Sequence, residues 1–403
     1  MRRSLHAAVL GTALLGLAAC GGGPGPRASS SASATSSSPA TRSSAAPSAP
    51  APASTAPAGP DAVVDAALAR MDARARVAQL FVVGVPLTGL GAGDALVQQG
   101  VGGVFLAGRS TIAATDLAQI TGRWVGEAPG PRPWIATDME GGQVQTLSGP
   151  GFGRFPSAVA QGQLPPDQLA VVARNLGAAL HSAGITLDLA PVADVVPAGT
   201  ERSNAPIGFF DRQYGSTPAQ VEAAAGTVVD GLAAHQVTAT VKHFPGLGRV
   251  TGNTDTTAGV TDTVTAAGDP SVTLFGVLAA RPAAPMVMVS LAIYSLIDGA
   301  QPAAFSPAVV TGVLREQLHY AGPVISDDLG MAKAVTAVAP GDRAVRFIAA
   351  GGTLVLTVVP SLLGPMIDAV TARAAADPAF AAQVDAAVRT DLLAKVRAGL
   401  LTG

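Results

Sequence analysis

The chain of 403 residues carries 25 basic and 27 acidic side chains, which gives a formal net charge of −2. Only three of the basic residues are lysines, and the chain lacks the basic surface that nucleic-acid binding requires, so we exclude a nucleic acid as partner. A single cysteine is present, which excludes a disulfide within the chain. The length suits one large domain or two smaller ones.

The first 19 residues have the pattern of an export signal. A basic start at Met1-Arg2-Arg3 precedes an apolar run that is too short to span a bilayer as a permanent helix. The run ends in Leu17-Ala18-Ala19-Cys20, which resembles the lipobox at which bacterial lipoproteins are cleaved and acylated. The resemblance implies that Cys20 is lipidated and holds the protein at the outer face of the cytoplasmic membrane. The alternative is an ordinary secretory signal in which Cys20 is incidental.

Residues 20–59 consist, after the cysteine, almost entirely of Ser, Ala, Pro, Gly and Thr. A segment of this composition buries too little apolar surface to offset the conformational entropy that folding removes. We therefore expect a disordered tether that carries one folded domain over residues 60–403.

Beyond the tether, short β-branched runs alternate with longer segments of helical period, which is typical of βα units around a parallel sheet. Eight such runs predict a single TIM-like (β/α)8 barrel of the α/β class. A doubly wound open sheet is the structural alternative. The predicted strands span residues 79–85, 101–106, 133–138, 186–195, 238–246, 285–292, 322–328 and 352–358.

Three of the intervening helices have clear start signals, because a proline suited to the first helical turn stands at each start. One helix is predicted to follow Pro165-Pro166-Asp167, with Gly184 as its C-terminal stop. The other two are predicted to follow Thr217-Pro218 and Ser306-Pro307. All three are expected to pack on the sheet as crossover helices.

Charged residues stand at the ends of four predicted strands. Ligands bind beyond the carboxyl ends of parallel strands in both candidate architectures, so these residues are expected to meet at one rim. Any one of them alone could be a helix cap or a solvated loop residue, but their convergence predicts a site. They are Asp138, Asp194, Lys242 with His243, and Asp327 with Asp328.

Three motifs, in this order along the chain, resemble glycoside hydrolase family 3. They are Asp138-Met139-Glu140-Gly141-Gly142, Lys242-His243-Phe244-Pro245-Gly246-Leu247-Gly248 and Ile325-Ser326-Asp327-Asp328-Leu329. The similarity covers about residues 63–403 and is greatest with single-domain bacterial β-N-acetylglucosaminidases. It implies a TIM-like barrel that acts on glycans or muropeptides containing N-acetylglucosamine, with no metal and no organic cofactor.

The resemblance also implies roles for individual residues. Asp327 matches the nucleophile, and a retaining glycosidase needs one such ionised carboxylate and a proton donor on the leaving-group side. The alternative for Asp327 is a helix cap, and that for His243 is a core histidine bonded to backbone carbonyls. Two extra residues separate Gly208 from Arg212, and Asp194 is expected only to brace the rim. The residues that match the substrate-binding set are Asp138, Arg212, Lys242 and His243.

The proton donor of the family is missing here. In the family pattern KHFPGHGxxxxDSH, the last histidine donates the proton and pairs with the aspartate two residues before it. The same register places Asn253 at that aspartate and Asp255 at that histidine. We predict Asp255 as the acid/base, with Asp262 as the reserve, because a carboxylic acid can serve when its surroundings raise its pKa. The alternative is that both carboxylates merely solvate a polar loop.

A second departure concerns cations. The family pattern DxEGGRVQR has arginines where this chain has Gln143 and Thr146. The loss of a forked cation weakens recognition of a hydroxyl array or a carboxylate. The substrate is therefore predicted less sharply than the reaction class.

Two functions are compatible with these observations. The first is a retaining exo-β-glycosidase of the cell envelope that removes terminal β-linked N-acetylglucosamine from peptidoglycan fragments, with transfer to phosphate instead of water as a variant. The second is a lipoprotein that binds saccharides or wall fragments and has lost hydrolysis together with the Asp–His pair.

Overall fold

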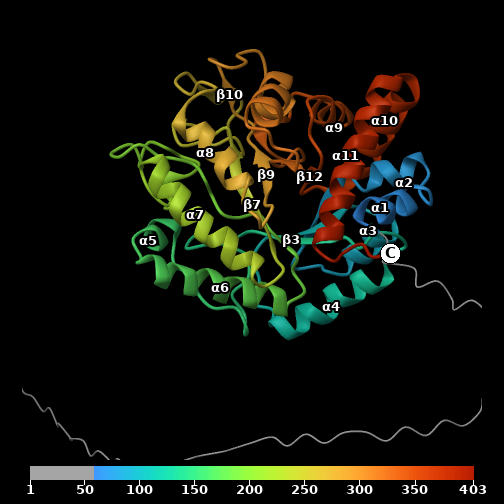
Figure 1. Cartoon of the computed structure of the whole chain (residues 1–403), viewed down its shortest axis with the longest axis horizontal. Helices are drawn as coiled ribbons and strands as arrows, with labels where there is room; N and C mark the ends of the chain where they lie inside the picture. Colours follow the sequence, from blue (N-terminus) through green and yellow to red (C-terminus); the bar gives the residue numbers. More distant parts are fainter. Residues whose placement is uncertain (1–58) are drawn as a thin grey trace, which may run out of the picture. The chain divides into compact units, whose positions relative to one another are not determined.

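The computed structural model describes residues 59–403, so the predicted signal peptide, Cys20 and nearly all of the tether lie outside the described residues. Within them, eight parallel strands form one sheet, and helices pack around it (Figure 1). The strands are β1 (Phe81–Pro86), β2 (Gly103–Ala107), β3 (Trp134–Thr137), β6 (Leu187–Asp188), β7 (Thr238–Phe244), β9 (Met286–Val289), β11 (Val324–Ser326) and β12 (Val355–Thr357).

The sheet closes into a barrel. Its strands are hydrogen-bonded in the order β11-β9-β7-β6-β3-β2-β1-β12, and a parallel bridge between Ile325 and Leu354 joins the two ends. Between the same two ends of the sheet, the Ser326 amide donates to the Leu354 carbonyl at 2.9 Å. The predicted TIM-like barrel is therefore confirmed. The open sheet is wrong, because it would leave these two edges unpaired.

One strand is much shorter than predicted. β6 pairs regularly only over Leu187–Asp188, whereas the prediction was a strand over residues 186–195. Pro191 has no N–H to donate to a ladder, so regular pairing stops before it. The chain beyond pairs with β7 through an isolated bridge at Val192. This irregular stretch carries Asp194 to the rim of the barrel.

Helices cover the outside of the barrel (Figure 1). Those that connect successive strands are α3 (Ala92–Gln98), α4 (Ala114–Glu127), α6 (Pro166–Ser182), α7 (Pro218–Ala233), α8 (Pro270–Ala279), the π-helix η3 (Ala308–Gln317) and α9 (Pro340–Ala349). The remaining helices are α1 (Pro60–Leu68), α2 (Ala73–Ala78), α5 (Ala158–Gly162), α10 (Leu363–Ala376) and α11 (Pro378–Arg397), with short 3-10 turns η1 (Gly208–Phe210), η2 (Ala303–Phe305), η4 (Lys333–Val335) and η5 (Pro360–Leu362).

The predicted helix starts are confirmed. The Thr217 hydroxyl accepts from the Gln220 amide in a capping box at the start of α7. α6 ends at Ser182, and Gly184 follows with a left-handed backbone conformation, at φ +71°, as predicted for the residue that stops this helix. After Ser306 the predicted helix forms, but its winding is π, and the Leu318 amide donates five residues back.

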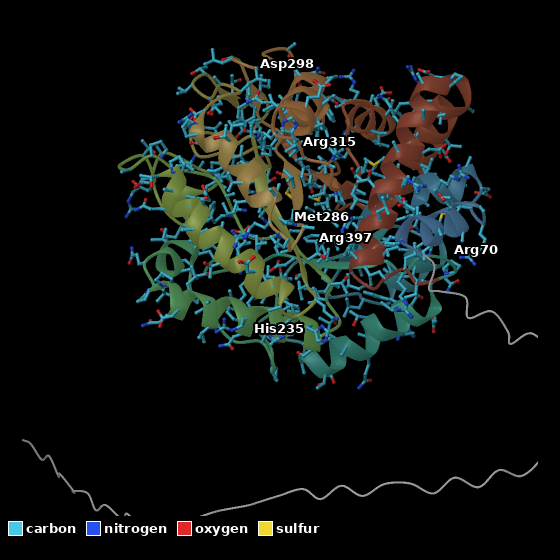
Figure 2. The ribbon with its side chains drawn as sticks, viewed as in Figure 1. Arg70, His235, Met286, Asp298, Arg315 and Arg397 are labelled. Carbon is cyan, nitrogen blue, oxygen red and sulfur yellow. The ribbon has the colours of Figure 1, made fainter. Side chains whose placement is uncertain are left out.

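Two apolar layers stabilise the barrel. The outer layer lies between strands and helices, and the inner layer fills the barrel with side chains such as Trp134, Met286 and Leu354. Leu400, from the C-terminal segment, belongs to the inner layer. Figure 2 shows Arg397, at the end of α11, close to Met286, and both residues line one hollow. The C-terminal segment thus covers the amino ends of the strands, which leaves the carboxyl ends for the site.

Two short strand pairs complete the loops above the barrel. Strands β4 (Met139–Gly141) and β5 (Val144–Gln145) form an antiparallel pair after β3. Strands β8 (Thr261–Asp262) and β10 (Ile293–Tyr294) pair in parallel between the loops that follow β7 and β9. Over the described residues, no helix combines the length and the apolar character needed to cross a membrane.

Candidate active site

A cavity of about 450 Å³ lies at the carboxyl ends of the barrel strands. Apolar side chains of β2, β9 and β12, including Phe105, Met288 and Leu356, form part of its wall. The structure brings all six predicted site residues to this one cavity, although they come from five separate parts of the chain. These residues are Asp138, Arg212, Lys242, His243, Asp255 and Asp327.

Four charged side chains, Asp138, Glu140, Arg212 and Lys242, form what we call the charged floor. The Lys242 ammonium donates to Asp138 Oδ1 at 2.7 Å and lies 2.7 Å from Glu140 Oε1. Arg212 donates two hydrogen bonds to the Glu140 carboxylate, from Nε at 2.8 Å and from Nη2 at 2.7 Å. Glu140 and Lys242 are each 3% exposed, whereas 28% of the Asp138 side chain is open to the cavity.

The charges of this floor hold one another in the ionised state. Burial by itself would raise the pKa of Glu140, but the attraction of Arg212 and Lys242 outweighs it and lowers that pKa to about 2. Burial would likewise lower the pKa of Lys242, yet the carboxylates of Asp138 and Glu140 raise it above its ordinary value. Glu140 and Lys242 therefore stay charged at any physiological pH.

Asp188, on β6, lies directly beneath this floor. One of its oxygens accepts from the Met139 amide at 3.0 Å, and the residue is fully buried. Burial, reinforced by the negative charge of Asp138, raises the pKa of Asp188 to about 8. Asp188 is consequently neutral near pH 7 and adds no further negative charge below Lys242.

His243 is held in one orientation by Asp194. The fully buried Asp194 carboxylate accepts from His243 Nδ1 at 2.7 Å and from the Leu247 amide at 2.6 Å. Since a carboxylate can only accept, the hydrogen-bond pattern assigns the ring hydrogen to Nδ1 and leaves Nε2 for the cavity side. Asp194 itself does not line the cavity, which agrees with its expected bracing position.

The two extra residues before Arg212 do not displace it. Residues Gly208–Phe210 form a 3-10 turn, and Asp211 follows at φ +56° in the left-handed region. The turn carries Phe209 outward, where 57% of that residue is exposed. The Arg212 amide then returns to the Ile207 carbonyl at 3.2 Å. The insertion is thus absorbed on the surface, and the guanidinium reaches the floor.

Asp327 and Asp328 follow β11 but have different surroundings. The Asp327 amide donates to the Val289 carbonyl of β9 at 3.0 Å, which fixes the residue at the end of the barrel. The Asp328 carboxylate accepts from three backbone amides, those of Gly330, Met331 and Val358, at 2.7 to 2.9 Å. Asp328 therefore shapes the loop. Asp327 also lines the cavity, and within residues 59–403 only one of its two oxygens, Oδ1, accepts a backbone hydrogen bond, from the Asp328 amide at 2.8 Å.

The loop after β7 brings Asp255 over the cavity. The Asp255 carbonyl accepts from the Lys333 amide at 3.0 Å, and the carbonyl of the buried Thr254 accepts from Ala334 at 3.0 Å. Asn253 Oδ1 also accepts from the Asp255 amide at 2.8 Å. The loop is therefore pinned to the segment that follows Asp327.

The carboxyl group of Asp255 has an unusual proton affinity. Burial of the carboxyl group, followed by the negative charge of Asp327, raises the pKa of Asp255 to about 6. Asp327 lines the same cavity, and a retaining glycosidase requires one carboxylic acid that donates a proton and a second carboxylate that acts as nucleophile. We call Asp255 and Asp327 the carboxylate pair.

Asp262, the predicted reserve acid, does not reach the cavity, so that prediction is wrong. Its side chain is 1% exposed and accepts from the amides of Val264 and Thr265 and from the Thr265 hydroxyl. A loop carboxylate satisfies backbone amides in this way as readily as it faces solvent. The local sequence does not distinguish the two arrangements.

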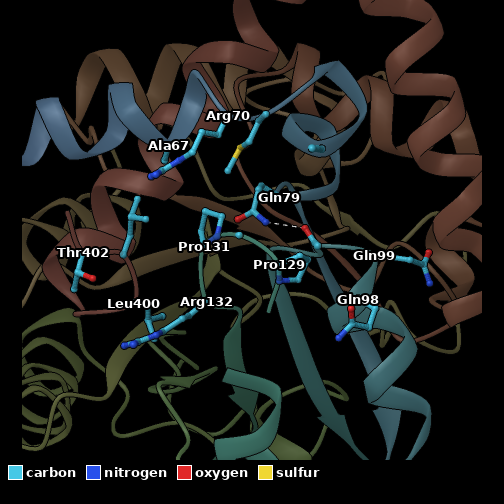
Figure 3. A pocket seen from close by; sticks show the side chains of 15 residues that line it. Ala67, Arg70, Gln79, Gln98, Gln99, Pro129, Pro131, Arg132, Leu400 and Thr402 are labelled. Atoms are coloured by element: carbon cyan, nitrogen blue, oxygen red, sulfur yellow. Dashed lines mark hydrogen bonds between the residues drawn. The ribbon is translucent and has the colours of Figure 1, made fainter. Parts of the chain in front are cut away.

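A larger cavity, of about 600 Å³, lies at the opposite end of the barrel (Figure 3). Gln79, which precedes β1, and Arg132, which precedes β3, line it together with Arg70 after α1. No carboxylate is among its lining residues. This cavity therefore lacks the groups that acid–base or nucleophilic attack on a glycoside would need.

Comparisons with known proteins agree with this geometry. The model of the glycosyl hydrolase family 3 N-terminal domain matches residues 73–390. The chain belongs to glycosyl hydrolase family 3. It is 33% identical to the β-hexosaminidase LpqI of Mycobacterium tuberculosis over 317 residues, which cover 74% of this chain and 76% of that protein.

Two solved structures are similar to this chain over most of its length. A β-N-acetylhexosaminidase from Beutenbergia cavernae shares 44% identity at a TM-score of 0.77, covering 81% of this chain and 99% of that one. The family 3 β-N-acetylglucosaminidase from Paenibacillus sp. has a TM-score of 0.72 at 26% identity, covering 82% of this chain and 63% of that one. The protein is thus a glycoside hydrolase, and the saccharide-binding alternative without hydrolysis is not favoured.

Glu140 is the site residue that the sequence analysis did not single out. It stands two positions after Asp138 on β4 and bridges Arg212 to Lys242. The alternation of a strand places residues i and i+2 on the same face, so the spacing of Asp138 and Glu140 was an available signal. Its buried partners come from residues far along the chain, which no local pattern reveals.

Proposed function

We propose that this family 3 enzyme is a retaining exo-β-glycosidase that hydrolyses terminal β-linked N-acetylglucosamine. The observation that supports it most is the carboxylate pair. Asp327 stands at the end of a barrel strand, and Asp255, with a pKa of about 6, faces the same cavity above the charged floor. The names of the β-hexosaminidase relatives support the same sugar.

The first step uses the two carboxyl groups in different protonation states. The ionised Asp327 attacks the anomeric carbon and forms a glycosyl ester, while the bond to the leaving oxygen breaks. The protonated Asp255 transfers its proton to that oxygen, so the aglycone leaves as an alcohol. After this step Asp255 carries the negative charge and Asp327 is covalently bound.

The second step reverses these roles. Asp255, now a carboxylate, removes a proton from a water molecule whose oxygen attacks the anomeric carbon. The ester bond breaks, Asp327 leaves as a carboxylate, and the sugar retains its β configuration. Transfer to phosphate would replace water by a phosphate oxygen at the same point, and a sugar 1-phosphate would then be the product.

The floor provides hydrogen-bonding groups for the terminal sugar. Asp138 uses one oxygen for Lys242 and can accept from sugar hydroxyls with the rest of its exposed carboxylate. His243 Nε2 faces the cavity because Asp194 holds Nδ1. Since these groups are already paired before substrate binds, little reorganisation is needed when the sugar enters.

The predicted location suggests the source of the substrate. A lipid anchor at Cys20 and a tether up to residue 59 would place the enzyme at the outer face of the cytoplasmic membrane, where peptidoglycan is turned over. We therefore propose muropeptide or glycan fragments with a nonreducing N-acetylglucosamine as substrates. Globomycin treatment of the expressing bacterium, which blocks lipoprotein processing, should leave the unprocessed precursor if Cys20 is the anchor.

Trapping of the nucleophile tests the chemistry. Purified enzyme should release the aglycone from an aryl β-N-acetylglucosaminide, and a 2-fluoro sugar should label a peptide that contains Asp327. Asp327→Ala should abolish labelling and lower kcat by roughly 10³-fold or more, because no ester forms. If the folded enzyme turns over neither the aryl glycoside nor N-acetylglucosaminyl-muramic acid, the proposed sugar is wrong.

A further inference from the structure

The chain has Gln143 and Thr146 at the two positions where the family pattern has arginines, and the backbone of Thr146 contacts the loop that follows β2. Thr146 is 7% exposed, and its amide donates to the Asp138 carbonyl at 3.1 Å. Its carbonyl accepts from the Ser110 amide at 3.0 Å. The loop that follows β2 therefore runs beside the β4–β5 pair, and Arg109 is the residue before the contact.

Arg109 extends from this loop to the other family position. Its guanidinium donates to the Gln143 carbonyl. Gln143 directly precedes Val144, which lines the catalytic cavity. One arginine, supplied by the loop after β2, thus lies beside both positions at which this chain lacks the cation of the family pattern.

The charge of Arg109 is not neutralised. Its one hydrogen bond goes to a neutral carbonyl, and across residues 59–403 no carboxylate forms an ion pair with it. The residue is exposed. Arg212 and Lys242, by contrast, are both paired with carboxylates deep in the floor. Arg109 therefore has donors and positive charge available to a ligand that approaches the β4–β5 pair.

We propose that Arg109 forms an anion-binding subsite for the leaving sugar, with selectivity for an aglycone that bears a carboxylate. The inference rests on the proposed function. An exo-acting enzyme holds the terminal sugar on the floor, so the leaving sugar must extend outward from the carboxyl ends of the strands. Arg109 follows β2 at that end and is hydrogen-bonded to the residue before the cavity-lining Val144. N-acetylmuramic acid carries a lactyl carboxylate, and a guanidinium binds a carboxylate through charge-assisted bonds.

Two disaccharides with the same linkage separate this subsite from catalysis. N-acetylglucosaminyl-muramic acid carries the carboxylate, and chitobiose is its neutral counterpart. Arg109→Gln should lower kcat/KM about tenfold on the anionic substrate, as expected for the loss of a charge-assisted hydrogen bond, and change it less than about twofold on chitobiose. Arg109→Lys should retain part of the preference, because the charge remains but the fork is lost.

Arg70→Gln is the matched control, since Arg70 is an exposed arginine at the opposite end of the barrel. It should leave the ratio of the two kcat/KM values unchanged. The preference of the unaltered enzyme for the anionic substrate should also shrink at high salt. An equal loss on both disaccharides in Arg109→Gln, or no loss on either, would overturn the proposal.

Binding measurements keep the subsite testable even where hydrolysis fails. In the Asp327→Ala background, calorimetry should give a Kd for N-acetylglucosaminyl-muramic acid that rises about tenfold when Arg109→Gln is added. An unchanged Kd refutes the subsite. Failure of the unaltered enzyme to cleave both disaccharides refutes the proposed function instead, and the two failures are therefore distinct.

Discussion

The charged floor and the carboxylate pair belong to the same site, but the pKa of a carboxyl group is shifted in opposite directions in the two regions. In the floor, Glu140 lies between Arg212 and Lys242 at hydrogen-bond distance, and its pKa falls to about 2. In the pair, Asp255 has another carboxylate as its neighbour, and its pKa rises to about 6. Both effects arise from burial combined with the sign of the nearest charge.

This difference separates binding from proton transfer. Fixed charges can orient a sugar without changing state during the reaction, whereas an acid/base must gain and lose a proton near the working pH. Aspartates occur in both regions, so the neighbouring charges, more than the residue type, determine whether a carboxyl group binds the sugar or transfers a proton. Three changes should break or sharpen this comparison.

The largest effect is expected from removal of the acid/base. Asp255→Ala should lower kcat/KM for a disaccharide by roughly 10²- to 10⁴-fold, because the leaving oxygen is no longer protonated. The loss should be much smaller for an aryl glycoside with a good leaving group, and added azide should restore part of the rate. Steady-state kinetics on both substrates measure the contrast.

Thr256→Ala is the control for the loop, since Thr256 is exposed and makes one long hydrogen bond of 3.4 Å to the Asn253 carbonyl. It should change neither rate by more than about twofold, as is usual for an exposed position. Equal losses on the two substrates in Asp255→Ala would contradict an acid/base role, because leaving-group protonation would then not matter.

A smaller effect is expected on stability. Glu140→Gln leaves Arg212 and Lys242 without their shared buried carboxylate and should lower the free energy of unfolding by about 3 kcal/mol. Asp255→Asn, in the other region, should leave it unchanged or slightly higher, because it removes repulsion from Asp327 and leaves no buried charge without a partner. Urea unfolding at pH 7 compares the two. Similar losses would show that the regions do not differ electrostatically.

The smallest effect is expected from pH. Glycosyl transfer needs protonated Asp255, so kcat/KM for a disaccharide should decrease as pH rises above about 6 and approach a tenfold decrease for each pH unit. Because the native state holds this proton more tightly than the unfolded chain, the free energy of unfolding should decline as pH rises from about 4 to about 6. Asp255→Asn should remove both the pH dependence of kcat/KM above pH 6 and this decline in stability. If kcat/KM of the variant still falls above pH 6, the fall belongs to another group.

Much of the fold was predictable because its signals are local. Hydrophobic runs of strand length located all eight barrel strands, and Thr217-Pro218 located the start of α7. The motifs around Asp138, Lys242 and Asp327 end barrel strands, so position in the sequence was enough to bring them to one rim. The length of β6 was overestimated, since a proline interrupts its ladder.

The sequence by itself therefore determined the barrel, its rim and the identity of most groups there, because strand period, turn signals and motif spacing are properties of neighbouring residues. The tertiary structure alone decided which charges are paired. Asp262 turns into its own loop, Asp255 shares a cavity with Asp327, and Arg109 reaches Gln143 from the loop after β2. Such contacts join residues distant in the chain, and the proton affinity of a carboxyl group depends on those contacts and on burial.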